Sequence, residues 1–275
     1  RAARELAADG GNEARAAIDA AFERETFWGV LAETARAIGA TRAPWAREIL
    51  IHALSHEHPK VVRAAAEALG NFRDAESATA LIATARSHRS YFVRNAAFTA
   101  LGKTRDERAF DELAAAAKLH TWNNVVEAGA LAGLAELADP RAMPLILEAA
   151  RPESGEALRR AAINALGRIG ALAEGERARA VDALAQYADD PSFLVALTAL
   201  EAAEALGDLR LVPALERVGR QAFDGRLRRH AMEAAIRIRK GSTVPAQVNT
   251  LRNDIDELRA EQRKLQEKIE AIART

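Results

Sequence analysis

The sequence contains no cysteine, few aromatic residues and no excess of charge of either sign. Among its 275 residues, the lack of cysteine excludes disulfides, thiolate catalysis and cysteine-ligated zinc, although it leaves the compartment open. The chain carries 39 basic and 39 acidic residues, a balance that argues against nucleic acid or an anionic membrane as its partner. No apolar run approaches the roughly 20 residues of a membrane-spanning helix. We therefore expect no membrane span, and the localisation stays unknown.

Alanine supplies much of what the sequence does contain. Hydrophobic residues make up 49% of the chain, yet aromatic residues only 5%. Alanine is the best helix former, and small side chains let helices approach one another closely. No strand signal of any length occurs in the sequence. The composition therefore predicts an all-α protein.

One decapeptide, at residues 61–70, recurs along most of the chain. Its sequence, VVRAAAEALG, has close copies at residues 93–102, 158–167 and 201–207, and a looser copy at residues 126–135. The apolar and small residues persist between copies, whereas nearly every polar position varies. The decapeptide is therefore expected to specify stacking of helices and not a binding site.

The copies end at a nearly constant interval. Their closing residues are Gly39, Gly70, Gly102, Ala135, Gly167 and Gly207. These are separated by 31, 32, 33, 32 and 40 residues. A nearly fixed period in this range is typical of a stacked repeat array. We attribute the longer last interval to residues 170–175 and to longer helices around them.

Local signals mark several helix starts. Pro44 and Pro59 each lie where a helix is expected to begin, a position at which the missing N–H costs nothing. Asp74 and Ser90 are predicted N-caps of the next two helices. These signals give each repeat the form of two helices joined by a turn.

The prediction is therefore an all-α fold, an α-solenoid of about seven helix pairs over residues 1–240. Residues 241–247 are predicted to form a linker and residues 248–273 a coiled-coil helix. Because the chain starts at Arg1 without methionine, we expect it to be part of a longer protein.

A strict heptad pattern marks the C-terminal helix. The predicted seam consists of Val248, Leu251, Ile255, Leu258, Gln262, Leu265, Ile269 and Ile272. β-branched residues at the first position and leucine at the fourth favour two strands, so a homodimer is one interpretation. The alternative is a single amphipathic helix that folds back on the last repeats.

Three histidines, His52, His56 and His58, lie close together in the sequence. Two histidines four residues apart on a helix can bind a metal ion. The residues around them predict a turn, however, and no H-E-x-x-H motif occurs. We therefore expect turn histidines and no metal site.

The sequence holds no recognisable catalytic motif. Gly102, Lys103 and Thr104 resemble the end of a phosphate-binding loop, but the preceding glycine and strand are missing. The many carboxylates are expected on solvated helix faces, where little separates their pKa values. We expect a segment that is not itself an enzyme and that has no catalytic residue and no cofactor.

Arginines and aspartates recur with the repeat. We predict a structural ladder in which arginines of the second helices bond turn carboxylates, and its members are Arg63, Arg94, Arg160, Asp74, Asp106 and Asp139. Such a ladder would set the stacking of neighbouring repeats.

Polar and aromatic residues mark the starts of several second helices. The candidate interaction surface consists of Trp28, Tyr91, Phe92, Trp122, Asn123 and Asn124. Exposed aromatic groups on one edge would suit recognition of a protein or peptide. The alternative interpretation is that each aromatic ring staples the entry of its helix to a neighbouring repeat.

The helix pair with a Val-Arg-x-Ala-Ala second helix, an Ala-Leu-Gly stop and an Asp-opened next helix resembles the HEAT-repeat superfamily. The likeness covers residues 12–240 and is strongest to the short bacterial repeats related to bilin lyases. It implies that the predicted pairs are HEAT-like, with an exposed face that binds protein partners.

A narrower resemblance rests on residues 27–35, 91–94, 122–125 and 129–135, which are similar to the C-terminal helical region of bacterial zinc aminopeptidases of the membrane-alanyl-aminopeptidase family. The resemblance implies an accessory role beside an upstream peptidase domain, where the repeats shape access to its active site. The zinc motif of that family is absent from this chain. The alternatives are a free-standing HEAT-repeat interaction adaptor and a bilin-lyase-like protein.

Overall fold

The computed structural model describes residues 11–241, and all regular structure within them is helical. The chain divides into two compact units, residues 1–169 and residues 170–275. Within the described range, no helix is long and apolar enough to cross a membrane. The heptad seam and nearly all of the predicted linker lie outside the described residues, so the coiled coil stays a prediction.

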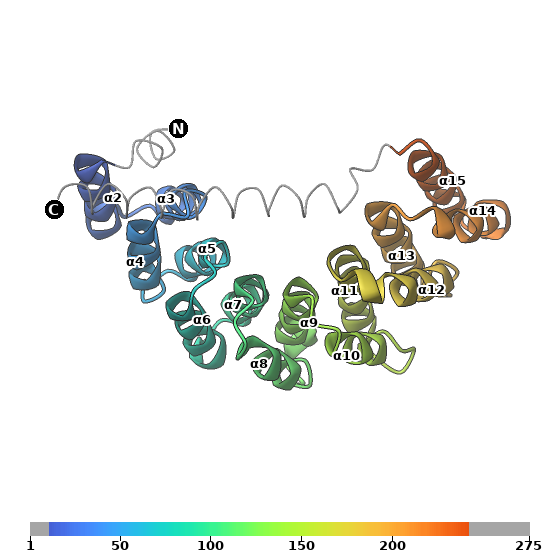
Figure 1. Cartoon of the computed structure of the whole chain (residues 1–275), viewed down its shortest axis with the longest axis horizontal. Helices are drawn as coiled ribbons and strands as arrows, with labels where there is room; N and C mark the ends of the chain where they lie inside the picture. The colour runs from blue at the N-terminus through green and yellow to red at the C-terminus, as the bar shows by residue number, and fades with distance from the viewer. Residues whose placement is uncertain (1–10, 242–275) are drawn as a thin grey trace, which may run out of the picture. The chain divides into compact units, whose positions relative to one another are not determined.

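Unit 1 consists of helix pairs, each with a first helix, a short turn and a second helix (Figure 1). The first helices are α2 (Asn12–Arg24), α4 (Pro44–Ala53), α6 (Ala75–Ser87), α8 (Ala109–Ala116) and α10 (Ala142–Ala149). The second helices are α3 (Trp28–Gly39), α5 (Pro59–Leu69), α7 (Tyr91–Thr104), α9 (Val125–Leu137) and α11 (Glu156–Leu172). A 3₁₀ turn, η1 (Trp122–Asn124), precedes α9.

Unit 2 contains two more pairs of the same kind. Its α-helices are α12 (Arg177–Tyr187), α13 (Phe193–Leu206), α14 (Val212–Gln221) and α15 (Gly225–Arg239). Two 3₁₀ turns, η2 (Glu174–Glu176) and η3 (Leu209–Leu211), precede α12 and α14. The described residues therefore hold seven helix pairs, and the predicted all-α solenoid of about seven pairs is confirmed.

In unit 1 the second helices form one continuous row. α3 packs on α5, α5 on α7 and α7 on α9. Figure 1 shows the first helices α4, α6 and α8 together on one side of this row. The leucines near the ends of the second helices, Leu69, Leu101 and Leu134, are completely buried. The residues that persist between copies of the decapeptide are thus the ones that fill the space between neighbouring helices.

The closest helix approach is between α7 and α9. A Cβ atom on Gly133 would lie 2.4 Å from a carbonyl oxygen of α7, and one on Gly129 would lie 2.5 Å from Cα of Asn95. Side chains of α7 also bond the α9 backbone, since Asn95 Nδ2 donates to the Val125 carbonyl at 2.7 Å and Thr99 Oγ1 to the Gly129 carbonyl at 3.3 Å. Only glycine leaves room for such an approach.

The predicted helix starts are confirmed with one exception. Both prolines occupy the first residues of α4 and α5, and the Asp74 carboxylate accepts the Ser77 N–H at 2.8 Å. Ser90 makes no side-chain capping bond to α7. Its own N–H instead donates to His88 Nδ1 at 3.0 Å, so the acceptor in this turn is an imidazole.

The 40-residue interval has its origin in α11. This helix has 17 residues and continues through Gly170 to Leu172 before η2 begins. The extra length therefore comes from a longer second helix together with a 3₁₀ turn, and residues 170–172 are helical.

Candidate interaction surface

The turns that join first to second helices in unit 1 lie along one edge of the helix row. Trp28, at the start of α3, stacks on His58, which precedes α5, with ring centroids 5.3 Å apart. Asn95, near the start of α7, bonds the carbonyl of Val125, the first residue of α9. Because neighbouring second helices run in the same direction, their N-terminal ends share this edge.

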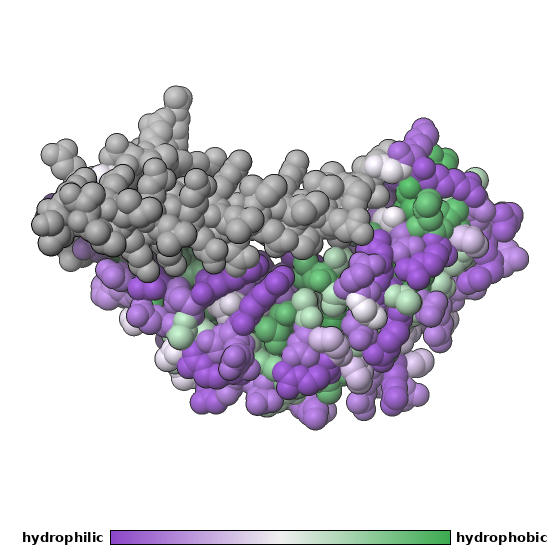
Figure 2. All heavy atoms as spheres, viewed as in Figure 1, coloured by the Kyte–Doolittle hydropathy of each residue, from purple (hydrophilic) through white to green (hydrophobic). Residues whose placement is uncertain are grey.

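Large apolar side chains lie along this edge, and we call five of them the aromatic edge: Phe27, Trp28, Tyr91, Phe92 and Trp122. Phe27 is 59% exposed, Phe92 57% and Trp122 66%. Tyr91 is less exposed and Trp28 is half-buried. In the face drawn in Figure 2, by contrast, the side chains over α6 and α8 are mostly hydrophilic.

Trp28 acts as a staple between two helices. Its ring lies parallel to the His58 imidazole, with an interplanar angle of 5°, and the Lys60 ammonium sits 4.0 Å from its centroid. Phe27 packs beside it at 5.7 Å. Trp28 therefore fits the interpretation as a staple. The high exposure of Phe92 and Trp122 fits the interpretation of these residues as recognition groups for a protein or peptide.

Trp122 sits on a rigid turn. Asn123 and Asn124, which follow it, both have positive φ angles of 52° and 54°, a region that asparagine tolerates better than most residues. The buried carboxylate of Glu127 accepts the backbone N–H and the hydroxyl of Thr121, each at 2.5 Å. This pair of bonds fixes the turn that carries the exposed indole.

Histidine side chains cap the turns before α5 and α7. His56 Nδ1 accepts the His58 N–H at 2.9 Å, His58 Nδ1 accepts the Lys60 N–H at 3.3 Å, and His88 Nδ1 accepts the N–H of Ser90. Burial lowers the pKa of His88, because an imidazolium loses hydration in the turn. His88 therefore stays neutral at neutral pH, which leaves its Nδ1 free to accept.

His52 lies on α4, one turn before this region. In residues 11–241, no three His, Cys, Asp or Glu side chains gather closely enough to hold a metal ion.

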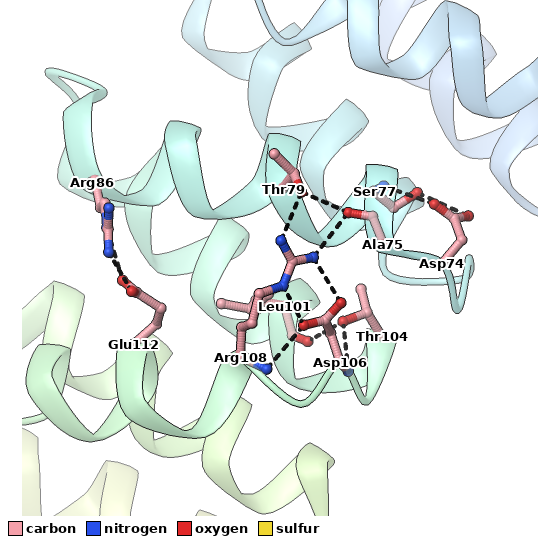
Figure 3. A network of polar contacts seen from close by, with 10 residues as sticks. All are labelled: Asp74, Ala75, Ser77, Thr79, Arg86, Leu101, Thr104, Asp106, Arg108 and Glu112. Carbon is pink, nitrogen blue, oxygen red and sulfur yellow. Dashed lines mark hydrogen bonds and ion pairs between the residues drawn. The ribbon is translucent and has the colours of Figure 1, made fainter.

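The turns at the opposite edge, which join one pair to the next, carry a different motif. Asp106 Oδ1 accepts the backbone N–H of Arg108 at 2.9 Å and its guanidinium at 2.8 Å (Figure 3). These bonds hold the pKa of Asp106 below its ordinary value. The same Asp-x-Arg clamp forms between pairs at Asp139 and Arg141 and at Asp208 and Arg210, and within the last pair at Asp224 and Arg226.

The clamp also reaches the preceding repeat. The Arg108 guanidinium donates to the Thr79 hydroxyl and the Ala75 carbonyl, both at 3.1 Å (Figure 3). Further along the same two helices, Arg86 Nε donates to Glu112 at 2.9 Å. Polar bonds near both ends of α6 thus join it to α8.

The predicted ladder is wrong in its pairing. It was expected to join Arg63, Arg94 and Arg160 to Asp74, Asp106 and Asp139. Asp106 and Asp139 bond the arginine two residues later, because a turn brings that side chain back onto the carboxylate. Asp74 bonds Ser77 and lies 3.6 Å from Arg47. Arg63 lies 3.5 Å from Glu67 of its own helix.

The repeat arginine has a different role from the predicted one. Arg94 Nε donates at 2.8 Å to the carbonyl of Ala85, near the end of the first helix of its own pair. Arg159, nine residues after Ala150, makes the same bond at 3.2 Å. The residue equivalent to Arg94 is therefore Arg159 and not Arg160, and it caps a helix end within the pair.

A buried polar cluster ties unit 2 together. The Asp208 carboxylate accepts from Arg210 and from Arg177 Nε at 2.8 Å, and Arg177 also donates to the Leu206 carbonyl at 3.2 Å. These hydrogen bonds, led by that of Arg210, hold the pKa of Asp208 well below its ordinary value of 3.8.

Two family models match parts of the chain. Residues 14–90 and 64–125 match HEAT repeats, and residues 158–190 match the PBS lyase HEAT-like repeat. No curated protein is a significant match to the sequence. The predicted resemblance to HEAT and bilin-lyase repeats is confirmed, whereas the resemblance to zinc aminopeptidases gains no support.

Two solved structures illustrate the likeness. One is the complex of CpcE and CpcF of phycocyanin lyase from Nostoc sp. PCC7120, at 19% identity over 80% of this chain and 93% of that chain, with a TM-score of 0.50. At this identity the likeness concerns the fold alone. The other is human deoxyhypusine hydroxylase in complex with glycerol, at 21% identity over 86% of this chain and 88% of that chain. Its TM-score of 0.39 is too low to bear on the fold.

Proposed function

We propose that this chain, built from HEAT-type helical repeats, is a protein-binding adaptor whose aromatic edge contacts the partner. The observation that carries the proposal is the recurrence of exposed aromatic side chains at or just before the start of the second helix in three pairs of unit 1. Phe27, Phe92 and Trp122 are each more than half exposed.

Physical chemistry favours these residues as contact groups. A Phe or Trp ring buries about 150–250 Å² when it is covered, and Trp and Tyr are enriched among residues that dominate binding energies. The backbone turn that carries Trp122 is fixed by the Glu127 bonds to Thr121, so little backbone freedom is lost when a partner covers the indole.

A direct test compares binding by the chain and by a double variant, Phe92→Ser with Trp122→Ser. Proteins retained by the tagged chain in its source organism are identified, purified, and titrated against each form by calorimetry. We expect the double variant to bind at least tenfold more weakly, since hot-spot residues contribute about 2 kcal/mol or more each. Leu209→Ser is the matched control, because Leu209 is 64% exposed but lies in η3 of unit 2.

Equal affinity of the double variant and the wild type for every purified partner would refute the proposal. A similar loss caused by Leu209→Ser would refute it as well, because the effect would then not belong to the aromatic edge. Circular dichroism of each variant shows that its fold is retained.

A bilin-lyase-like role is a second candidate, favoured by the match of residues 158–190 to the PBS lyase repeat. Co-expression with a biliprotein and its pigment tests it, and absence of a coloured adduct would remove it. The accessory role beside a zinc aminopeptidase is a narrower form of the adaptor. An H-E-x-x-H motif upstream of Arg1 in the parent sequence would support that form.

Self-association is a further part of the proposal. The heptad residues from Val248 to Ile272 have the pattern of a two-stranded coiled coil. Light scattering of the chain with and without residues 246–275 tests it. A monomer in both cases would exclude the homodimer.

A further inference from the structure

The turns before several second helices use the same capping bond but different side chains. Three residues before the helix starts, a side-chain acceptor takes the N–H of the residue two positions later. In unit 1 this acceptor is Glu25 before α3, at 2.8 Å, but it is His56 before α5 and His88 before α7, at 2.9 Å and 3.0 Å. In unit 2 it is Asp190, at 2.9 Å from the Ser192 N–H.

The same exchange occurs directly before a helix. His58 Nδ1 accepts the Lys60 N–H at the start of α5, whereas Asp224 Oδ1 accepts the Arg226 N–H at the start of α15. An imidazole and a carboxylate therefore both accept the backbone N–H two residues later and cap the start of a helix. They differ in charge, because the aspartate is anionic at neutral pH and a capping imidazole is neutral.

Histidine at this place recurs with the repeat. His56, His88 and His120 are each 32 residues apart, and His120 lies in the turn that leads to the exposed Trp122. The turns before α5 and α7 thus have an imidazole where the turn before α13 has a carboxylate, and the carboxylate in the turn before α9, that of Glu127, is buried.

The remaining charges of these central turns are mostly positive. Lys60, Arg89 and Lys118 are exposed there, with Glu57 as the exposed acid. The Lys60 ammonium lies against the Trp28 ring, so cation and aromatic group form one surface. The N-terminal ends of α5 and α7 add positive partial charge along the same edge.

From these observations we infer that the aromatic edge binds an extended acidic segment of a partner protein, with apolar side chains between its carboxylates. The inference rests on the proposed adaptor function and specifies its partner. Apolar side chains of the segment cover Phe92 and Trp122, and its carboxylates face Lys60 and Arg89.

The repeat spacing sets the spacing expected in the partner. Packed helices lie about 8–10 Å apart, and an extended chain advances about 3.3 Å per residue. One acidic residue about every three positions therefore matches one cation per repeat. A single-stranded nucleic acid carries a phosphate on every nucleotide and would need more cations than these turns provide.

The test is a selection of random peptides of about 12 residues, displayed on phage, against the full chain. We expect the selected peptides to be acidic, with aromatic or aliphatic residues between the acids. Labelled synthetic copies are then titrated against the wild type and against Lys60→Glu with Arg89→Glu. This charge variant should bind at least tenfold more weakly at about 50 mM salt, with a smaller difference at about 300 mM.

Lys103→Glu is the matched control, because Lys103 is exposed in the last turn of α7, at the opposite edge. It should leave the affinity within about twofold, since exposed charges beyond a Debye length are screened. A loss equal to that of the Lys60 and Arg89 variant would overturn the inference.

The outcomes separate the inference from the adaptor function. Peptides that need Phe92 and Trp122 but bind the charge variant equally well would overturn the acidic partner and leave the adaptor intact. Peptides whose binding requires neither Phe92 nor Trp122 would overturn both the acidic partner and the adaptor function of the aromatic edge. Tighter binding of labelled oligothymidylate than of any peptide, lost in the charge variant, would replace the protein partner by a nucleic acid.

Discussion

Replacing Gly133 by alanine tests the tightest helix contact in unit 1. The new Cβ would lie 2.4 Å from the Phe98 carbonyl oxygen and 2.6 Å from a methyl carbon of Leu113. Neither the α7 backbone nor the packed leucine has room to give way locally, so α7 and α9 must separate by about 1 Å. A gap of that size forfeits roughly a quarter to a half of the dispersion energy of each affected contact.

The magnitude follows from two opposing effects. Overpacking of this kind costs about 1–3 kcal/mol, and stretching the bonds from Asn95 and Thr99 to the α9 backbone costs about 1 kcal/mol more. The better helix propensity of alanine returns up to about 1 kcal/mol. We expect Gly133→Ala to lose about 1–4 kcal/mol of unfolding free energy, or about 2–16 °C in melting temperature.

Urea and thermal unfolding followed by circular dichroism measure this loss. Hydrogen exchange with mass spectrometry should show faster exchange confined to α7 and α9. Gly175→Ala is the control, because a Cβ there has no neighbour within 4 Å. If Gly133→Ala were as stable as the wild type or more stable, the close approach of α7 and α9 would be refuted.

Three further predictions concern polar groups. Glu127→Ala should cost about 2–3 kcal/mol in urea unfolding and speed hydrogen exchange in residues 121–124, because both Thr121 donors lose a buried acceptor; unchanged exchange would contradict the role of the Glu127 bonds in fixing this turn. Asp208 has a lowered pKa, so its stabilising effect is complete above its ordinary pKa of 3.8 and is lost as the pH falls below that value. Asp208→Asn should therefore make unit 2 less stable at neutral pH and less sensitive to acid in thermal unfolding, and parallel pH profiles for the two forms would disprove this. Arg159→Met should destabilise by about 1–3 kcal/mol, whereas Arg168→Met, which removes a more exposed pair with Glu136, should cost less than about 1 kcal/mol in the same assay.

Much of the fold was predictable because the repeat obeys local rules. Small and apolar residues at fixed spacing, with proline and aspartate at helix starts, specify helix pairs without any knowledge of their neighbours. The run of α11 through Gly170 was harder to predict, because its length depends on packing, with Gly170 set against Ala180. A glycine that ends one helix continues another when the neighbouring helix covers it.

The polar partners were less predictable than the helices. Arg94 follows Val93, whereas residues 159 and 160 are both arginine. The sequence offers two candidates for the equivalent of Arg94, and the prediction chose Arg160, one residue after the true equivalent, Arg159. The Asp-x-Arg spacing was present in the sequence at four places and would have identified the clamps. The positive φ angles at Asn123 and Asn124 had no signal stronger than the residue type.

The Asp-x-Arg clamps bear on how such a chain changes length during evolution. Each clamp neutralises its own aspartate within three consecutive residues, and Arg108 bonds the preceding repeat through a backbone carbonyl and a hydroxyl. A repeat duplicated or deleted together with its clamp therefore leaves no unpaired carboxylate at the junction. The corner is a self-contained module, so repeats can be gained, lost or exchanged without matching charges in their new neighbours.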